Sequence, residues 1–296
     1  MVSPLFGIFP ALTTPFAGDA VALDRFRDNI HRYNGYDLSG YIVLGSTGEC
    51  VFLTDEESER LVRTARESAA AGKKVVAGTA RESTKLTIDF TNRLAGLGID
   101  AALVRPPAYY KARMDREALR RHYLTLADHS RVPVIIYNIP QNTGIVLEPS
   151  LLVDLAAHPN IAGLKDSSGH LAMIADVQFR VKSDFSYLLG AGSVFVPALA
   201  LGASGAILAV ADAAPGLCAE AYTQFLEKKL DQAFEIQKAL IPLNRAVTEI
   251  YGIPGLKYGL DLLGFYGGPC RVPLGELPDK GKADLRAILE KLGLLR

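Results

Sequence analysis

Residues 134–137 and 161–165 read Val-Ile-Ile-Tyr and Ile-Ala-Gly-Leu-Lys, two short apolar runs separated by a stretch with helical signals. An apolar run that does not alternate with polar residues is typical of a parallel strand covered on both faces. Both runs end in a side chain with acid–base chemistry, Tyr137 and Lys165. The pair therefore indicates strand–helix units whose carboxyl ends carry reactive groups.

The same alternation extends along the chain in both directions. Further apolar runs predict strands at 7–13, 40–44, 74–78, 101–104, 187–190 and 205–210. Between them, Leu86, Phe90, Leu94 and Leu97 recur at helical spacing. Eight units favour a (β/α)8 TIM barrel over a doubly wound sheet, and no Gly-x-Gly-x-x-Gly follows the first strand. We expect the barrel at residues 1–225 and a C-terminal helical extension packed on it at 226–296.

The composition excludes several classes of protein. With 296 residues, 49% hydrophobic and 22% charged, the chain is neither disordered, collagen-like nor a small disulfide scaffold. Lys plus Arg and Asp plus Glu number 32 each, so no basic excess is present to bind nucleic acid. Residues 185–211 carry no charge and are long enough to span a bilayer. Glycines and a proline divide that segment, so two strands flanking a short helix explain it better.

Metal and redox signals are weak. The three cysteines are far apart and lack Cys-x-x-Cys spacing, which gives neither a zinc site nor a disulfide framework. The five histidines show no ligand spacing, and we find no acidic cluster for a divalent ion. We therefore expect a cytoplasmic protein without a metal and without a nucleic-acid or membrane partner.

Active sites of such barrels form at the carboxyl ends of the strands. Lys165 ends an apolar run, where its cationic form is poorly solvated, and a neutral amine can attack a carbonyl carbon. The alternative is a lysine that extends to solvent or pairs with Asp166. Tyr137 can relay a proton, although a tyrosine at this place can also be a packing residue.

Two other loops carry candidate binding groups. Ser46 and Thr47 follow the second strand in a turn flanked by glycines, and their hydroxyls and amides suit a carboxylate or phosphate. The alternative is an ordinary strand-to-helix turn. Tyr109 and Tyr110 follow the fourth strand, where a packed aromatic pair is the alternative to a functional one.

Three motifs together resemble the signature of the dihydrodipicolinate synthase/N-acetylneuraminate lyase superfamily. They are Gly45-Ser46-Thr47-Gly48-Glu49, Tyr137-Asn138-Ile139-Pro140 and Gly163-Leu164-Lys165-Asp166-Ser167. Residues 252–257 and 267–271 are similar to the superfamily's C-terminal region, so the resemblance covers nearly the whole chain. It implies a class I aldolase that forms a Schiff base with pyruvate and needs no metal or organic cofactor.

The resemblance also implies roles for individual residues. Lys165 would form the imine with C2 of a 2-oxo acid, and Tyr137 would shuttle protons at the substrate hydroxyl or aldehyde oxygen. Thr47 would act with Ser46 to hold the C1 carboxylate and relay protons. Tyr110, with Tyr109 as its alternative, would reach a neighbouring subunit's site in a homotetramer built as a dimer of dimers. Gly190 and Ile207 would line the pyruvate pocket. Apart from the resemblance, the hydroxyl and amide donors Thr47, Ser167 and Asn142 suit the carboxylate of a short acceptor such as glyoxylate.

Within the superfamily, the resemblance points towards the 4-hydroxy-2-oxoglutarate aldolases. That similarity is carried by Tyr109-Tyr110 with Arg113-Met114 and by residues 142–144, 242–248 and 266–271. It predicts cleavage of 4-hydroxy-2-oxoglutarate to pyruvate and glyoxylate. One departure is Thr47, which stands where those aldolases carry Asn and which also occurs in sialic acid lyases.

Three alternatives stay open. A dihydrodipicolinate synthase (4-hydroxy-tetrahydrodipicolinate synthase) usually carries an Arg soon after Tyr-Asn-x-Pro, where this chain has Asn142. A dehydratase or hydratase-aldolase would use the same imine on deoxy-oxo sugar acids or aryl pyruvates. A non-catalytic pyruvate binder is the third alternative, and the presence of both Lys165 and Tyr137 argues against it.

Overall fold

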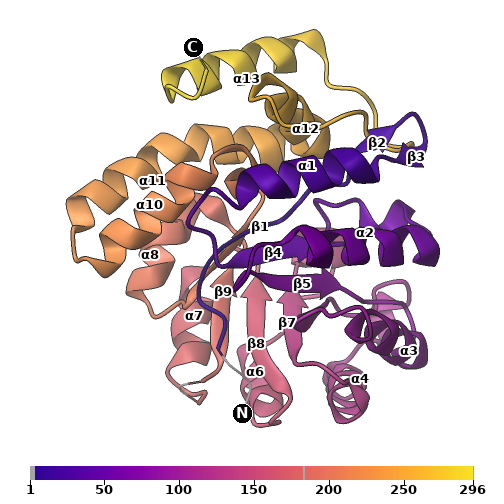
Figure 1. The fold of residues 1–296 in the computed structure, drawn as a ribbon. Helices are drawn as coiled ribbons and strands as arrows, with labels where there is room; N and C mark the ends of the chain where they lie inside the picture. The colour runs from indigo at the N-terminus through magenta and orange to yellow at the C-terminus, as the bar shows by residue number, and fades with distance from the viewer. Residues whose placement is uncertain (1–3, 183, 296) are drawn as a thin grey trace. The chain divides into compact units, whose positions relative to one another are not determined.

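All eight predicted strands are present in the computed structural model, which describes residues 4–182 and 184–295 (Figure 1). They are β1 (Gly7–Pro10), β4 (Gly40–Val43), β5 (Lys74–Gly78), β6 (Ala101–Val104), β7 (Val134–Asn138), β8 (Ile161–Asp166), β9 (Ser186–Leu189) and β10 (Gly205–Leu208). Their order in the sheet is β1-β10-β9-β8-β7-β6-β5-β4. A second, two-stranded sheet pairs β2 (Phe16–Ala17) with β3 (Ala20–Val21).

Helices alternate with these strands, which confirms the predicted (β/α)8 barrel. They are α1 (Leu23–Tyr33), α2 (Asp55–Ser68), α3 (Thr84–Ala95), α4 (Arg116–His129), α5 (Pro140–Thr143), α6 (Pro149–Ala156), α7 (Leu171–Gln178), α8 (Phe195–Ala200), α9 (Val210–Ala213) and α10 (Pro215–Leu226). Three more follow towards the C-terminus: α11 (Leu230–Arg245), α12 (Gly252–Leu262) and α13 (Asp279–Lys291). The predicted division after residue 225 falls at the end of α10 and stays a prediction.

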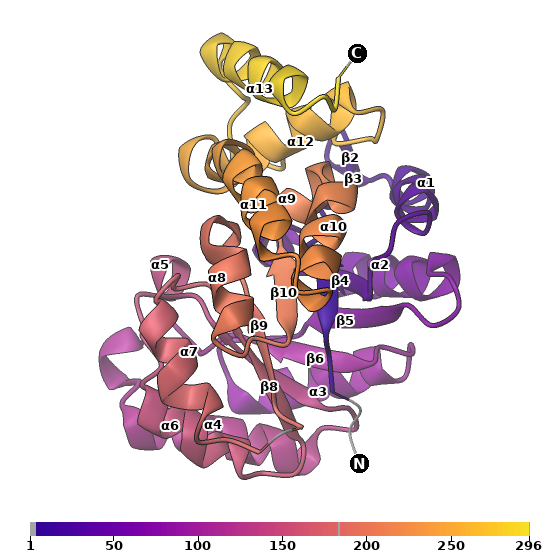
Figure 2. The same ribbon diagram turned by 90° about the vertical axis from the view of Figure 1, so that its left-hand side faces the viewer.

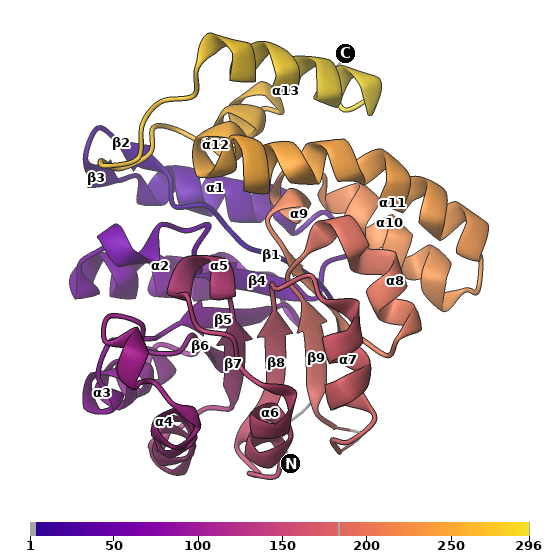
Figure 3. The same ribbon diagram turned by 180° about the vertical axis from the view of Figure 1, so that it is seen from behind.

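The chain forms two compact units. The first is Met1–Phe6 with Val76–Ala206, and the second is Gly7–Val75 with Ile207–Arg296. In the first unit, the pairings from β5 to β10 are all parallel. Figure 3 shows β7, β8 and β9 side by side with their arrowheads pointing the same way. The carboxyl ends of these strands therefore meet at one edge.

An extra residue in β8 sets the register of the central pair. Val134 pairs with Ile161, whereas the next residue, Ile135, pairs with Gly163, so Ala162 is left over as a bulge. Beyond the bulge, β7 and β8 stay in step, and Tyr137 pairs with Lys165. Because successive side chains of a strand point to opposite faces, paired residues share a face.

The second unit is built on β1, β4 and the end of β10. Ala11 donates a backbone hydrogen bond to the Leu208 carbonyl (3.0 Å), and Leu12 donates one to the Ile42 carbonyl (3.0 Å). Thr54 is the N-cap of α2 and forms a capping box with Glu57. Further along this unit, α10 and α11 lie side by side (Figure 2).

The uncharged segment at 185–211 forms β9, α8 and β10, as predicted. Over the ranges that the structure describes, every helix is too short or too polar to cross a membrane. The expected cytoplasmic location stays a prediction.

Candidate active site

The side chains of Lys165 and Tyr137 lie together at the carboxyl ends of β8 and β7. The Lys165 Nζ is 4.1 Å from the centroid of the Tyr137 ring. Both side chains are buried, with 4% and 6% of their surface exposed. Their pairing across the ladder fixes this contact through the backbone. The structure therefore places an amine and a phenol within reach of one small substrate.

Asp166 is engaged on the opposite face of β8. Its buried carboxylate accepts hydrogen bonds from the Asn138 amide (2.8 Å), the Tyr187 hydroxyl (2.9 Å), the Ser168 N–H (3.0 Å) and the Ser168 hydroxyl (2.9 Å). Burial and the nearby carboxylate raise the pKa of Tyr187, so its hydroxyl stays a donor. Since the strand alternates its side chains, this network leaves Lys165 to the other face. It argues against the alternative in which Lys165 pairs with Asp166.

The loops after β8 and β9 approach each other closely. The Gly190 N–H donates to the Asp166 carbonyl at 2.6 Å. A Cβ on Gly190 would lie 2.0 Å from the Ser167 Oγ and 3.0 Å from its Cβ, so a larger residue here would force Ser167 to shift. The Gln141 amide donates to the Ser167 carbonyl (3.2 Å), which holds α5 against the end of β8. Asn142 is the next residue of α5 and is exposed.

The two tyrosines after β6 form an exposed pair. The rings of Tyr109 and Tyr110 meet edge-on, 5.0 Å apart, and are 79% and 71% exposed. Glu82 holds their loop by accepting the backbone N–H groups of Ala108 (2.8 Å) and Tyr109 (2.9 Å), and it pairs with Arg105 (2.8 Å). Burial raises the pKa of Glu82, but these hydrogen bonds and the guanidinium outweigh it and hold that pKa below its usual range.

The remaining predicted residues belong to the second unit. Ser46 and Thr47 are half-buried in the turn after β4, and Ile207 is buried on β10. The Gly48 carbonyl in that turn accepts a hydrogen bond from the Thr14 hydroxyl at 2.7 Å. Both hydroxyls of the predicted carboxylate site therefore lie on a turn that a hydrogen bond from Thr14 helps to hold in place.

Sequence reasoning gave no role to a buried ion pair beside this turn. The Lys257 Nζ lies 2.5 Å from the Glu49 Oε1, and each residue is only 1% exposed. Lys257 also donates to the Pro269 carbonyl (2.8 Å). Burial lowers the pKa of Lys257, against the opposing effect of Glu49. The available signal was that Glu49 ends the first of the three motifs and Lys257 ends the 252–257 segment, which is similar to the superfamily's C-terminal region.

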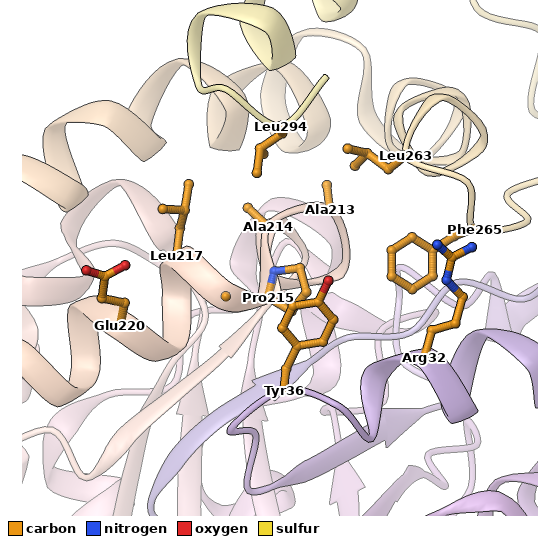
Figure 4. A pocket seen from close by; sticks show the side chains of 11 residues that line it. Arg32, Tyr36, Ala213, Ala214, Pro215, Leu217, Glu220, Leu263, Phe265 and Leu294 are labelled. Carbon is orange, nitrogen blue, oxygen red and sulfur yellow. The ribbon is translucent and has the colours of Figure 1, made fainter. Parts of the chain in front are cut away.

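A pocket of about 410 Å³ opens elsewhere in the second unit. Arg32, Tyr36, Glu220, Phe265 and Leu294 are among the residues that line it (Figure 4). The predicted site residues all lie outside this lining. Within the described ranges, no group of three or more His, Cys, Asp or Glu side chains is arranged to hold a metal ion.

Comparison with known proteins identifies the family. The model of the Dihydrodipicolinate synthetase family matches residues 4–292. The chain belongs to this family. A 4-hydroxy-tetrahydrodipicolinate synthase from Methanothrix thermoacetophila is 34% identical over 289 residues, covering 97% of this chain and 96% of the relative. One from Methanoculleus marisnigri is 35% identical over 292 residues, covering 97% and 99%.

Solved structures of the dihydrodipicolinate synthetase family agree with the fold. The dihydrodipicolinate synthase of Aquifex aeolicus matches with a TM-score of 0.93 at 30% identity, covering 98% of this chain and 99% of that one. That of Thermotoga maritima gives a TM-score of 0.94 at 27% identity, with the same coverage.

Family membership confirms the predicted class of chemistry. Members are carbon–carbon lyases of the aldolase type that form a lysine Schiff base with pyruvate and use no external cofactor. The two curated relatives are 4-hydroxy-tetrahydrodipicolinate synthases. Their names favour the synthase alternative over the cleavage of 4-hydroxy-2-oxoglutarate that the sequence similarity predicted.

Proposed function

We propose that this chain forms an imine between Lys165 and C2 of pyruvate and uses it to join pyruvate to a short aldehyde, or to reverse that step. The observation that carries the proposal is the buried contact of Lys165 with Tyr137 at two paired strand ends. An amine removed from water is a competent nucleophile, and the phenol beside it can move protons without a water molecule.

The proposed steps balance without a metal or an oxidant. The Lys165 amine attacks C2, Tyr137 gives a proton to the C2 oxygen so that it leaves as water, and the iminium that remains withdraws electrons from C3. Return of a C3 proton to Tyr137 gives an enamine, whose C3 attacks the aldehyde carbon. Tyr137 protonates the alkoxide that forms. Water, or an amine of the substrate itself, then displaces Lys165 from C2, and cleavage takes the same steps in reverse.

Binding of the pyruvate carboxylate is assigned from the sequence resemblance. Ser46 and Thr47 would hold the C1 carboxylate, and Thr47 would pass protons to the imine. Gly190 and Ile207 would line the pyruvate pocket. The half-buried hydroxyls on the turn after β4 support this assignment, because a partly desolvated donor binds an anion more strongly than a solvated one.

Aspartate semialdehyde is the first candidate for the acceptor. The proposal rests on the curated relatives, which carry the name 4-hydroxy-tetrahydrodipicolinate synthase and align over nearly the whole chain. With this acceptor, the substrate's own amino group would displace Lys165 and close the ring.

A second candidate, cleavage of 4-hydroxy-2-oxoglutarate, is favoured by one residue. Asn142 stands where synthases usually carry an Arg, and it is exposed on α5 beside the end of β8. An amide cannot form the bidentate, charge-assisted hydrogen bonds that a guanidinium forms with a carboxylate. Each hydrogen bond to a charged group contributes about 1.5–3 kcal/mol. Glyoxylate is smaller than aspartate semialdehyde, and its carboxylate would then bind Thr47, Ser167 or Asn142.

The active unit is proposed to be a homotetramer in which Tyr110 serves a neighbouring subunit's site. The exposure of Tyr109 and Tyr110, on a loop that Glu82 holds in a fixed shape, supports this role. An aromatic pair of this kind is costly to leave in water and is typical of an interface core.

Borohydride trapping tests the imine. The protein is incubated with pyruvate and sodium borohydride, digested, and analysed by peptide mass. We expect the adduct on Lys165, none in Lys165→Arg, because a guanidinium stays protonated, and a normal adduct in Lys238→Arg, which changes an exposed lysine. An adduct on another lysine, or none in the native protein, refutes the proposal.

A substrate panel tests the acceptor. Aspartate-semialdehyde condensation, 4-hydroxy-2-oxoglutarate cleavage and water loss from deoxy-oxo sugar acids are compared at matched concentrations of trapped active sites. The highest kcat/KM with aspartate semialdehyde supports the first candidate, and the highest with 4-hydroxy-2-oxoglutarate supports the second. Asn142→Arg should raise kcat/KM for aspartate semialdehyde under either outcome, and an unchanged value shows that residue 142 does not select the acceptor.

A further inference from the structure

The turn that carries Ser46 and Thr47 is bounded by two residues in an unusual backbone conformation. Leu44 has a φ of 59° and Glu49 a φ of 55°, and neither is a glycine. Left-handed conformations of such residues are uncommon and persist where the surrounding structure holds them. The left-handed backbone conformation of Glu49, at the C-terminal end of this turn, therefore needs contacts that stabilise it.

The C-terminal part of the second unit supplies the contacts of Glu49. Its Oε1 forms the buried ion pair with Lys257 of α12, at 2.5 Å. Its Oε2 accepts the backbone N–H of Arg271 at 2.9 Å. Lys257 and the backbone of Arg271, both in the C-terminal segment 257–271, thus bind the Glu49 carboxylate at the end of the turn.

The same segment also binds residues 52 and 57, on the C-terminal side of the turn. The Arg271 guanidinium donates to both carboxylate oxygens of Glu57, in the first turn of α2 (2.7 and 2.8 Å), and to the Phe52 carbonyl (2.7 Å). Lys257 and Arg271 each lie over the ring of Phe16, 4.5 Å from its centroid. The turn is therefore fixed to the C-terminal segment at Glu49 and again at the start of α2.

We propose that Glu49, held by Lys257 and the Arg271 amide, is a positioning residue that keeps Ser46 and Thr47 in the conformation that binds the pyruvate carboxylate. This inference rests on the proposed function, since it needs those hydroxyls to bind pyruvate. A purely architectural ion pair would change stability alone. A positioning residue changes the affinity for pyruvate in molecules that are folded and can still form the imine.

Three variants separate these roles. Glu49→Gln keeps the side-chain shape and an acceptor for the Arg271 amide but loses the charge that attracts Lys257. The double variant Glu49→Gln with Lys257→Met leaves no buried charge, so it should fold better than a variant with one unpaired ion. Phe16→Leu is milder and removes only the ring over which both cations lie. Lys280→Met, which breaks an exposed ion pair with Asp284 on α13, is the matched control.

The readout is the split between KM for pyruvate and kcat, per active site counted by borohydride trapping at saturating pyruvate. Glu49→Gln and the double variant should raise the pyruvate KM about tenfold or more while kcat per trapped site changes by less than about threefold. Lys280→Met should leave both unchanged.

Three other outcomes are decisive. An unchanged KM in Glu49→Gln and in the double variant overturns the inference and leaves Glu49 an architectural residue. If neither variant is soluble, Phe16→Leu decides: a KM raised severalfold supports the inference, and an unchanged KM overturns it. Failure of the native protein to form the Lys165 adduct refutes the proposed function instead.

Discussion

The Tyr187 hydroxyl offers a direct measurement of how strongly the Asp166 network holds the end of β8. Tyr187→Phe removes one of four donors to a buried carboxylate and leaves the packing of the ring intact. A hydrogen bond to a charged acceptor contributes about 1.5–3 kcal/mol, against about 0.5–1.5 kcal/mol for a neutral one. We therefore expect the free energy of unfolding to fall by about 1.5–3 kcal/mol.

Tyr123→Phe is the matched control. Tyr123 is equally buried, but its hydroxyl donates to the neutral Val104 carbonyl at 3.1 Å. Urea unfolding of both variants, followed by circular dichroism with the slope held constant, gives the two losses on one scale. The loss for Tyr187→Phe should exceed that for Tyr123→Phe by about 1–2 kcal/mol. Equal losses would show that the hydrogen bond from Tyr187 to Asp166 stabilises the end of β8 no more than a hydrogen bond to a neutral carbonyl does.

Three further outcomes are expected. Tyr137→Phe should keep part of the borohydride adduct on Lys165 but lose about 10²–10⁴-fold in turnover; unchanged turnover would leave Tyr137 a packing residue. Burial lowers the pKa of His122 to about 4. Because the unfolded value is about 6.5, the unfolded state gains a proton first and stability should fall between about pH 6.5 and 4, by up to roughly 3 kcal/mol. Denaturant titrations of His122→Gln should lack this part of the pH dependence, and an identical pH profile would contradict it. Dilution to the monomer, followed by sedimentation and activity, should abolish turnover if Tyr110 serves a neighbouring subunit, and full activity in the monomer would exclude that role.

The strands were predictable because burial on both faces leaves a strong apolar signal. Each of the eight runs became a strand, and Lys165 and Tyr137 were found by their place at strand ends. The bulge at Ala162 was not predictable, since a strand that is buried throughout shows no alternation whose phase could shift. The hairpin of β2 and β3 was also missed, because two-residue strands are too short to show any period.

The candidate site residues were predictable where a strand end or a short local motif marks them. Ser46 and Thr47 are adjacent, and Lys165 stands in one short motif. The pairing of Glu49 with Lys257 joins positions far apart in the chain, and no periodicity links them. The acceptor is harder still, because Asn142 is an exposed side chain whose partner would be the substrate itself.

The pairing of Tyr137 with Lys165 bears on how the acceptor specificity of this protein can be engineered. On the proposed function Lys165 and Tyr137 activate pyruvate, and both stand on strands joined by a hydrogen-bonded ladder. Gln141, Asn142 and Thr143 lie in the short helix α5 outside that ladder, and Gly144 follows it as a left-handed C-cap. A library of substitutions at Asn142, whose side chain is exposed, would vary this helix while keeping the Gln141 hydrogen bond to Ser167 and the left-handed Gly144. Directed evolution can thus keep β7 and β8 unchanged and vary the exposed residue of α5.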